Sequence, residues 1–144
     1  MNFLTNTKMT RVENSAVAGT GTLTSDVIDG KGFDGVTFLA ALGDVLVDAV
    51  ITFQAQHGDQ SDSSDAVNIA GSVVTHTATA SDADNKLLAL EIARPTKRFL
   101  RVTLARTVAN TVLDGIFAFQ NNPAESPVVQ DASVLATKFA LSPV

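Results

Sequence analysis

Two histidines and several closely spaced aspartates are the residues of this chain that could take part in catalysis or metal binding. Hydrolysis by a serine nucleophile needs a serine on a sharp turn, a histidine base and a carboxylate that orients the base. The chain has no Gly-x-Ser-x-Gly motif, and its histidines are His57, at the start of a polar loop, and His76, on a mixed segment. The lack of cysteine also excludes a thiol nucleophile and a thiolate zinc site. We therefore expect no enzymatic activity.

The spacing Asp59-x-x-Asp62-x-x-Asp65 could offer oxygen ligands to a hard cation. A helix-loop-helix calcium site requires an Asp-x-Asp-x-Asp-Gly pattern and a distal glutamate, and neither is present here. Asp82-x-Asp84 is a second partial match. Acidic, serine-rich turns also arise because short polar side chains hydrogen-bond to nearby backbone amides. We prefer this interpretation, and the sequence predicts neither a metal site nor a cofactor.

Charge is distributed unevenly along the chain. Residues 32–85 contain eight aspartates and no lysine or arginine, whereas residues 86–106 contain six cations and one glutamate. The basic segment lacks interleaved aromatic residues for base stacking, and the chain has a net charge of −5, so we expect no nucleic-acid partner. Solvated surface loops are the simplest interpretation of both charged segments, and we prefer it. The alternative is that these segments form surfaces complementary to each other or to a partner, and an acidic protein surface is then the expected partner of the basic segment. The predicted contact residues are Arg94, Lys97, Arg98, Phe99 and Arg101.

Length and composition indicate one folded domain. The chain has 144 residues, of which 45% are hydrophobic and only 17% are charged. A chain of this size can bury a substantial core, and this composition does not fit intrinsic disorder. No run of 18 apolar residues is present, and the first 15 residues hold no continuous apolar stretch. We therefore expect neither a membrane span nor a signal peptide.

Short segments of alternating apolar and polar residues indicate strands. The strongest are Val36–Leu42, Ala49–Gln56, Leu87–Ile92, Phe99–Arg106 and Thr111–Gln120. In the last segment Leu113, Phe117 and Phe119 share a face with Gly115, which marks a bulge or kink. The weaker candidates are Val12–Ala18, Asp26–Ile28, Val73–Ala80 and Val134–Leu141. Eight or nine strands predict an all-β fold, a single-domain antiparallel β-sandwich or jelly roll of about eight strands.

One segment allows a second interpretation. Leu42, Val45, Leu46 and Ala49 are spaced as on one face of a helix. A short helix over 40–49 is therefore the alternative, which a glycine and β-branched residues within it disfavour. We assign residues 1–25 to an N-terminal arm or first strand and residues 26–120 to the sandwich core. Residues 121–144 form a proline-containing loop followed by a C-terminal strand or arm.

Three stretches, in a fixed order, follow the pattern of a known family. Asp26–Phe38 contains an Ile-Asp step, a Gly-Phe pair and a Val-Thr-Phe strand. Asp82–Lys86 is an acidic turn before an apolar strand, and in Pro95–Val102 an aromatic residue follows Lys-Arg. Over about two-thirds of the chain this ordered set resembles the capsid decoration, or cement, proteins of tailed bacteriophages. The first 25 residues and the tail after Pro123 depart from the pattern.

The resemblance implies a virion structural protein that binds the outer surface of the expanded phage head and staples neighbouring major capsid subunits. It implies the major capsid protein as partner, self-association as a dimer or trimer, and no membrane or nucleic acid. The expected location is the capsid exterior, after assembly in the bacterial host cytoplasm. Outward apolar residues such as Leu39 and Phe99 fit a surface that a subunit partner buries.

Two alternatives remain. The first is a structural protein of the phage tail or of the head–tail junction, where β-sandwiches also occur. The second is a carbohydrate-binding sandwich. Sugar-binding platforms use exposed tryptophan or tyrosine for stacking, and this chain contains neither, which disfavours the second alternative.

Overall fold

The computed structural model describes residues 2–142, which form one short helix and eight strands. In chain order the elements are α1 (Phe3–Asn6), β1 (Lys8–Glu13), β2 (Ala16–Thr24), β3 (Ile28–Asp29), β4 (Phe33–Val45), β5 (Val50–Gly58), β6 (Val67–Thr77), β7 (Leu87–Ala93) and β8 (Phe99–Pro123). All the strand pairings are antiparallel. The predicted all-β fold class is confirmed. No helix within residues 2–142 is long and apolar enough to cross a membrane.

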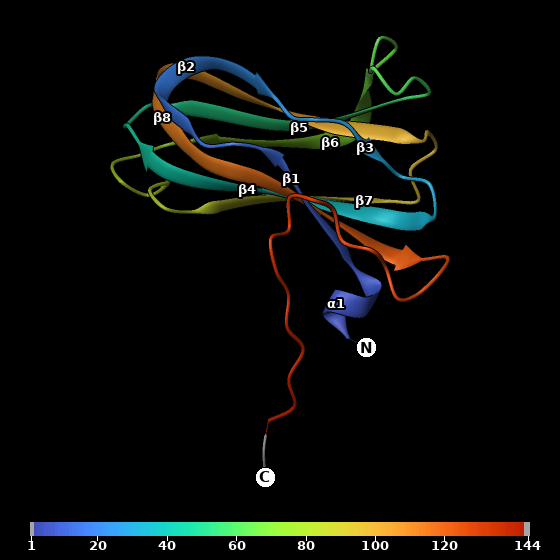
Figure 1. Cartoon of the computed structure of the whole chain (residues 1–144). Coiled ribbons are helices and arrows are strands. Elements are labelled where there is room, and N and C mark those ends of the chain that lie inside the picture. Colours follow the sequence, from blue (N-terminus) through green and yellow to red (C-terminus); the bar gives the residue numbers. More distant parts are fainter. Residues whose placement is uncertain (1, 143–144) are drawn as a thin grey trace.

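The strand β8 is the centre of the sheet, whose order is β6-β5-β8-β4-β7. Its first half pairs with β5 on one side and with β2 and β3 on the other. Its second half pairs with β4 and with β1. The sheet curls around the core, so that β5 and β6 form a layer that faces β4 and β7 (Figure 1). Because β8 belongs to both layers, it connects the two halves of the sandwich.

A bend in β8 lets the strand pass from one layer to the other. In the pairing with β2, Gly21 lies opposite Arg106 and Gly19 lies opposite Thr111, so four residues of β8 face a single residue of β2. Within this bulge Val108 has a φ of 73°, a left-handed conformation. Bulges of this kind increase local twist and are frequent where a strand changes sheet.

The buried Arg106 holds this bend together. Its side chain is only 7% exposed, and its guanidinium donates hydrogen bonds to the backbone carbonyls of Val17, Thr20, Gly21 and Thr111 at 2.9–3.4 Å. A guanidinium has five N–H donors in a fixed plane and can therefore bond several carbonyls at once. Arg106 thereby joins both halves of β8 to β2.

The core lies between the two layers and follows the alternation in the sequence. One face of each alternating segment is buried: in β4 and β5 this face includes Phe38 and Phe53, which are fully buried. In the predicted strand Phe99–Arg106, which is the first part of β8, the alternating apolar residues Leu100, Val102 and Leu104 are buried as well. The helix considered for residues 40–49 is absent, because β4 continues to residue 45 and a turn follows.

The face assignment in the second half of β8 is wrong. Leu113 is buried as predicted, but the next buried side chains are Ile116, Ala118 and Gln120, whereas Phe117 and Phe119 lie on the outer face. The pairing with β4 shifts register next to Gly115, so one extra residue enters β8. Because side chains alternate with period two, one extra residue moves every later side chain to the opposite face.

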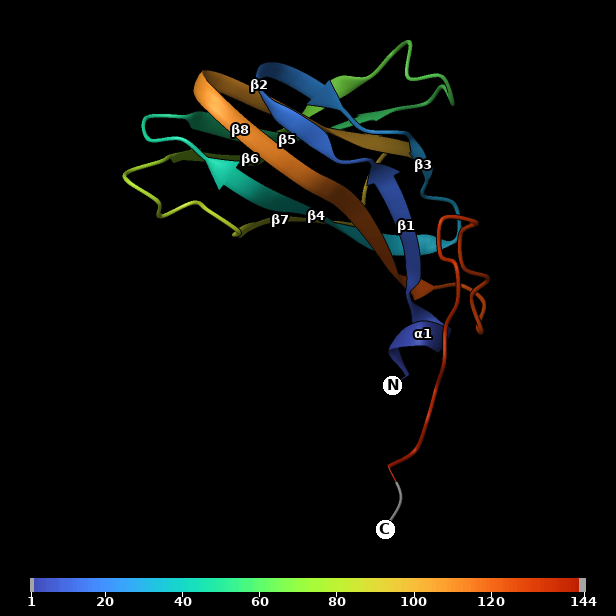
Figure 2. The ribbon, with the colours of Figure 1, turned by 60° about the vertical axis from the view of Figure 1, so that its left-hand side comes forward.

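The two ends of the chain differ from each other. The first 25 residues contain α1, β1 and β2, and both strands pair with β8. The strand expected over 134–141 is not formed, because residues 124–142 pair with no strand of the described chain. After Val134 the chain runs away from the sandwich as an extended tail (Figures 1 and 2).

Candidate binding surface

The predicted basic contact residues lie where the chain leaves β7 and enters β8. They are Arg94, Lys97, Arg98, Phe99 and Arg101. The turn is anchored by its backbone, since the amide of Arg94 donates to the carbonyl of Asp34 at 2.7 Å and the amide of Gly30 donates to the carbonyl of Arg98 at 2.7 Å. We call residues 94–98, which join β7 to β8, the basic turn. The two backbone bonds place it beside the connection from β3 to β4 and the start of β4.

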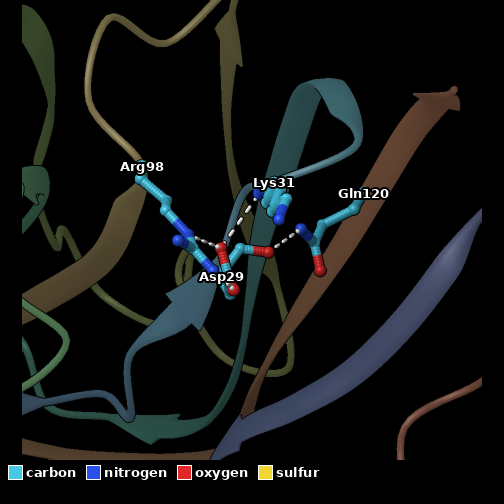
Figure 3. A network of polar contacts seen from close by, with 4 residues as sticks. All are labelled: Asp29, Lys31, Arg98 and Gln120. Carbon is cyan, nitrogen blue, oxygen red and sulfur yellow. Dashed lines mark hydrogen bonds and ion pairs between the residues drawn. The ribbon is translucent and has the colours of Figure 1, made fainter.

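The side chain of Arg98 is bound to Asp29. Its Nε and Nη2 atoms each donate a 2.8 Å hydrogen bond to one oxygen of the Asp29 carboxylate. The same carboxylate accepts from the amide of Lys31 at 3.0 Å, and the Asp29 carbonyl accepts from Nε2 of the buried Gln120 at 2.9 Å (Figure 3). The guanidinium of Arg98, followed by the amide of Lys31, holds the pKa of Asp29 below its ordinary value. The pair is partly exposed, so it orients the arginine more than it stabilises the fold.

Two further cations of the turn have partners in the same chain. The Nζ atom of Lys97 lies 3.4 Å from the Asp59 carboxylate, and Nε of Arg101 donates to Oε1 of Gln56 at 2.8 Å. Arg94, by contrast, has an exposed side chain that forms no hydrogen bond or salt bridge with residues 2–142. Part of the basic segment is therefore neutralised by the acidic segment of the same molecule.

Phe99, the first residue of β8, contacts the side chain of Arg98. The guanidinium carbon of Arg98 is 5.0 Å from the centre of the Phe99 ring, within the range of a cation–π interaction. The ring is half-buried, so one part of it packs and the other part remains accessible. Arg98 and Phe99 together form a fixed pair at the surface.

The aspartates of the 59–65 loop hold the loop itself. The Asp65 carboxylate accepts from the amides of Asp59 and Gln60 at 2.8 and 3.1 Å, and Asp62 accepts from the amide of Ser64 at 2.9 Å. These amide bonds lower the pKa of both Asp62 and Asp65. Within residues 2–142 no three His, Cys, Asp or Glu side chains converge as a metal site would require. The geometry matches the preferred interpretation of these residues as turn-forming.

His76 and Asp82 form a second polar pair. Nε2 of His76 lies 3.1 Å from Oδ2 of Asp82, which also accepts from the Thr79 hydroxyl at 3.2 Å. Asp82 also accepts from the amide of Thr79, and this bond is the main cause that lowers the pKa of Asp82. A nucleophile–base pair needs a hydroxyl bonded to the second ring nitrogen. Within the described chain the imidazole has Asp82 as its one side-chain partner.

An apolar groove on the outer face of the β1–β8–β4 layer was missed from the sequence. This outer groove has a volume of about 470 Å³ and is lined by Met9, Thr10, Arg11, Leu39, Phe117, Phe119, Ser133 and Val134. The outward Leu39 was expected, but Phe117 and Phe119 were predicted to share a face with Leu113, which is buried. The signal that could have revealed them was Gly115, since a bulge at that position reverses the face of both rings.

Arg11 forms one wall of the outer groove. Its guanidinium carbon lies 5.4 Å from the centre of the Phe117 ring, and its Nη2 atom donates to the carbonyl of Asp114 at 3.0 Å. A Cβ atom at Gly115 would lie 2.9 Å from the same nitrogen. Glycine at this position therefore lets the arginine side chain cross β8 at close range.

The segment before the C-terminal tail covers the free edge of β1. The side-chain oxygen of Gln130 accepts from the amide of Met9 at 2.7 Å, and the hydroxyl of Ser133 accepts from the amide of Arg11 at 2.9 Å. Nε2 of Gln130 also donates to the carbonyls of Leu4 and Thr7. An uncovered strand edge invites pairing with another chain. Here side chains occupy two of its amides.

Comparison with known proteins finds similarity of structure only. No protein-family model and no curated protein matches the chain. Among solved structures, the chain is similar to the Eiger TNF from S. frugiperda, at 8% identity and a TM-score of 0.36, covering 83% of this chain and 99% of that one. It is also similar to a chain of Desmodium yellow mottle tymovirus, at 9% identity and a TM-score of 0.35, covering 90% and 91%. Similarities this low carry no information about function.

Proposed function

We propose that the chain is a virion structural protein that binds the outer surface of the expanded phage head and staples neighbouring major capsid subunits. The observation that carries this proposal is the contact between two of the three motifs that resemble phage decoration proteins. The Ile28–Asp29 step pairs in register with Leu100 and Phe99, and the side chain of Asp29 binds Arg98. Residues that carry the resemblance thus form one structural unit, as expected if the resemblance reflects a shared architecture.

The character of the surface supports a binding role. The outer groove and the extended tail each present apolar side chains at the surface. Exposed apolar patches on a folded chain are typical of a protein interaction site. A cement protein needs many modest contacts repeated over a lattice, whose combined strength far exceeds that of one contact. The proposal includes no catalytic step, cofactor or nucleic acid.

The basic turn is the surface that we assign to the major capsid protein. Arg98 is held in one orientation by Asp29 and rests on Phe99, so little side-chain freedom would be lost on binding. Arg94 carries a charge that no partner within residues 2–142 neutralises and could pair with an acidic capsid side chain. Arginine and aromatic residues are enriched in the centres of protein interfaces.

A co-sedimentation titration tests the proposal. Increasing amounts of chain are added to expanded, undecorated heads of the phage that encodes it, and to unexpanded heads as the matched control. We expect saturable binding to expanded heads, with a whole number of chains for each lattice position, and weak binding to unexpanded heads. Lack of binding to expanded heads would contradict the proposal. Co-purification with tails would favour a tail or head–tail junction protein instead.

A further inference from the structure

The C-terminal tail carries an apolar stripe that nothing in the described chain covers. Leu135, Phe139 and Leu141 are 99%, 58% and 82% exposed. In an extended chain all three lie on the same side, together with Thr137, because side chains alternate with period two. The opposite side carries Ala136, Lys138 and Ala140. The tail therefore has the alternation of a half-buried strand without a surface to cover its apolar side.

The outer groove is a surface of matching character. Its apolar lining consists of the half-buried side chains of Leu39, Phe117, Phe119 and Met9, together with Val134. Ser133 and Val134, the last residues before the apolar stripe, belong to its lining. The stripe over 135–141 is about 23 Å long when extended.

The tail does not enter the groove from which it starts. Ser133 is fixed to β1 through the amide of Arg11, and the next residues run away from the sandwich in both views (Figures 1 and 2). To return, the chain would have to reverse direction directly after Val134. Residues 134–141 contain no Gly, Pro, Asn or Asp, the residues that make tight turns. The groove is therefore more accessible to the tail of another molecule.

We propose that residues Leu135–Leu141 of one molecule dock in the outer groove of a second copy of this chain. Because the tail starts next to residues that line the groove, a two-fold axis beside Val134 would allow both molecules to exchange tails at once. With the apolar stripe facing the groove, Lys138 points away from Arg11, so the two cations do not oppose each other. This inference deepens the proposed function, because exchanged tails would link neighbouring copies of a decoration protein.

Charged substitutions on the two sides of the tail test the inference without heads. Leu135→Asp with Phe139→Asp places two charges on the apolar stripe, and Ala136→Asp with Ala140→Asp places the same charges on the opposite side. Association is measured by sedimentation equilibrium over a range of concentrations, with circular dichroism to check the fold. We expect the unmodified chain and the variant with Ala136→Asp and Ala140→Asp to associate equally strongly. The variant with Leu135→Asp and Phe139→Asp should associate at least ten-fold more weakly. A monomer at all concentrations, or association equal in all three chains, would overturn the inference.

Disulfide trapping identifies the contact itself. The chain has no cysteine, so Phe139→Cys and Leu39→Cys can be introduced on two differently tagged copies. We expect oxidation to join the two tagged copies, and to do so much less when the second cysteine replaces the exposed Thr107 on the distant half of β8. With both cysteines in one chain, a purely intramolecular disulfide would show that the tail folds back, and would overturn the inference. Since neither assay contains heads, failure here leaves the head-binding proposal to its own test.

Discussion

Arg98 and Asp29, 69 residues apart in the chain, form a two-pronged ion pair with two hydrogen bonds of 2.8 Å. The pair joins the short strand β3 to the basic turn before β8, and Gln120 binds the Asp29 carbonyl from the second half of β8. Gly30 permits this approach, since a Cβ atom there would lie 2.9 Å from the carbonyl oxygen of Arg98. Three separate parts of the chain therefore meet at Asp29.

Replacing Asp29 with asparagine should lower stability slightly near neutral pH. The pKa of Asp29 in the folded state lies below its ordinary value of 3.8, so the ionised carboxylate stabilises the fold above that pH. The stabilisation is lost as pH falls below 3.8 and through the lowered pKa. Urea denaturation over this range should therefore show the unmodified chain and Asp29→Asn converging at low pH. Asp44→Asn is the control, because Asp44 is exposed and has no side-chain partner within residues 2–142. If the unfolding free energies of the Asp29 and Asp44 variants depended equally on pH, the prediction would be contradicted.

Replacing Arg106 with methionine should cost about 1–3 kcal/mol of unfolding free energy, because buried carbonyls would lose their donor. Four carbonyls around the bend of β8 accept from this side chain. Arg106→Lys should recover only part of the loss, since an ammonium group lacks the planar donor geometry. Urea denaturation measures the effect. The half-buried Arg101, changed to methionine, is the matched control, and an equal loss at both positions would contradict a special role for Arg106.

Replacing Gly58 with alanine should loosen the 59–65 loop. A Cβ atom at this position would collide with the Asp65 carboxylate, which accepts from the amides of Asp59 and Gln60. Hydrogen exchange at these two amides should become about ten-fold faster or more, because the bonds that protect them would be lost. Asp65→Ala should accelerate exchange at these amides equally. The double variant should exchange little faster than either single variant, since both changes remove the same hydrogen bonds to the Asp65 carboxylate. Independent, additive effects would argue against this coupling.

Charge reversal tests the basic turn as a head contact. Arg94→Glu leaves the internal ion pairs intact, and we expect it to weaken binding to expanded heads and to reduce the salt sensitivity of binding. Arg98→Glu should do the same, but it also breaks the pair with Asp29. The double variant with Asp29→Arg and Arg98→Glu restores an internal ion pair. If this double variant still binds heads weakly, the loss of binding comes from the changed surface charge at position 98 and not from the broken pair. Binding that is unchanged across salt in all variants would contradict the assignment.

The alternation of apolar residues was sufficient to predict the fold class and most of the core. Val36–Leu42 and Ala49–Gln56 follow an uninterrupted period of two, so their buried faces could be assigned directly. In β8 the extra residue beside Gly115 breaks this period. The sequence marked the bulge but not the number of residues it inserts, and the assignment of Phe117 and Phe119 was wrong for that reason.

The candidate surface was predictable only in part. The basic residues of the 94–101 segment could be found from their charge, but their partners could not. Asp29 and Asp59 reach the turn through the packing of the sheet, and nothing in their local sequence indicates it. Residues 134–141 show the opposite case. Their alternation predicts a strand, but a strand needs a neighbour, and the described chain offers none.

The most direct test of the decoration role is cryo-electron microscopy of expanded, undecorated heads mixed with the purified chain. We predict regular density at symmetry-related positions on the outside of the shell, into which the sandwich fits with the basic turn toward the major capsid subunits. Bare heads at saturating concentrations of chain, or density only at the tail or its junction with the head, would contradict the decoration role.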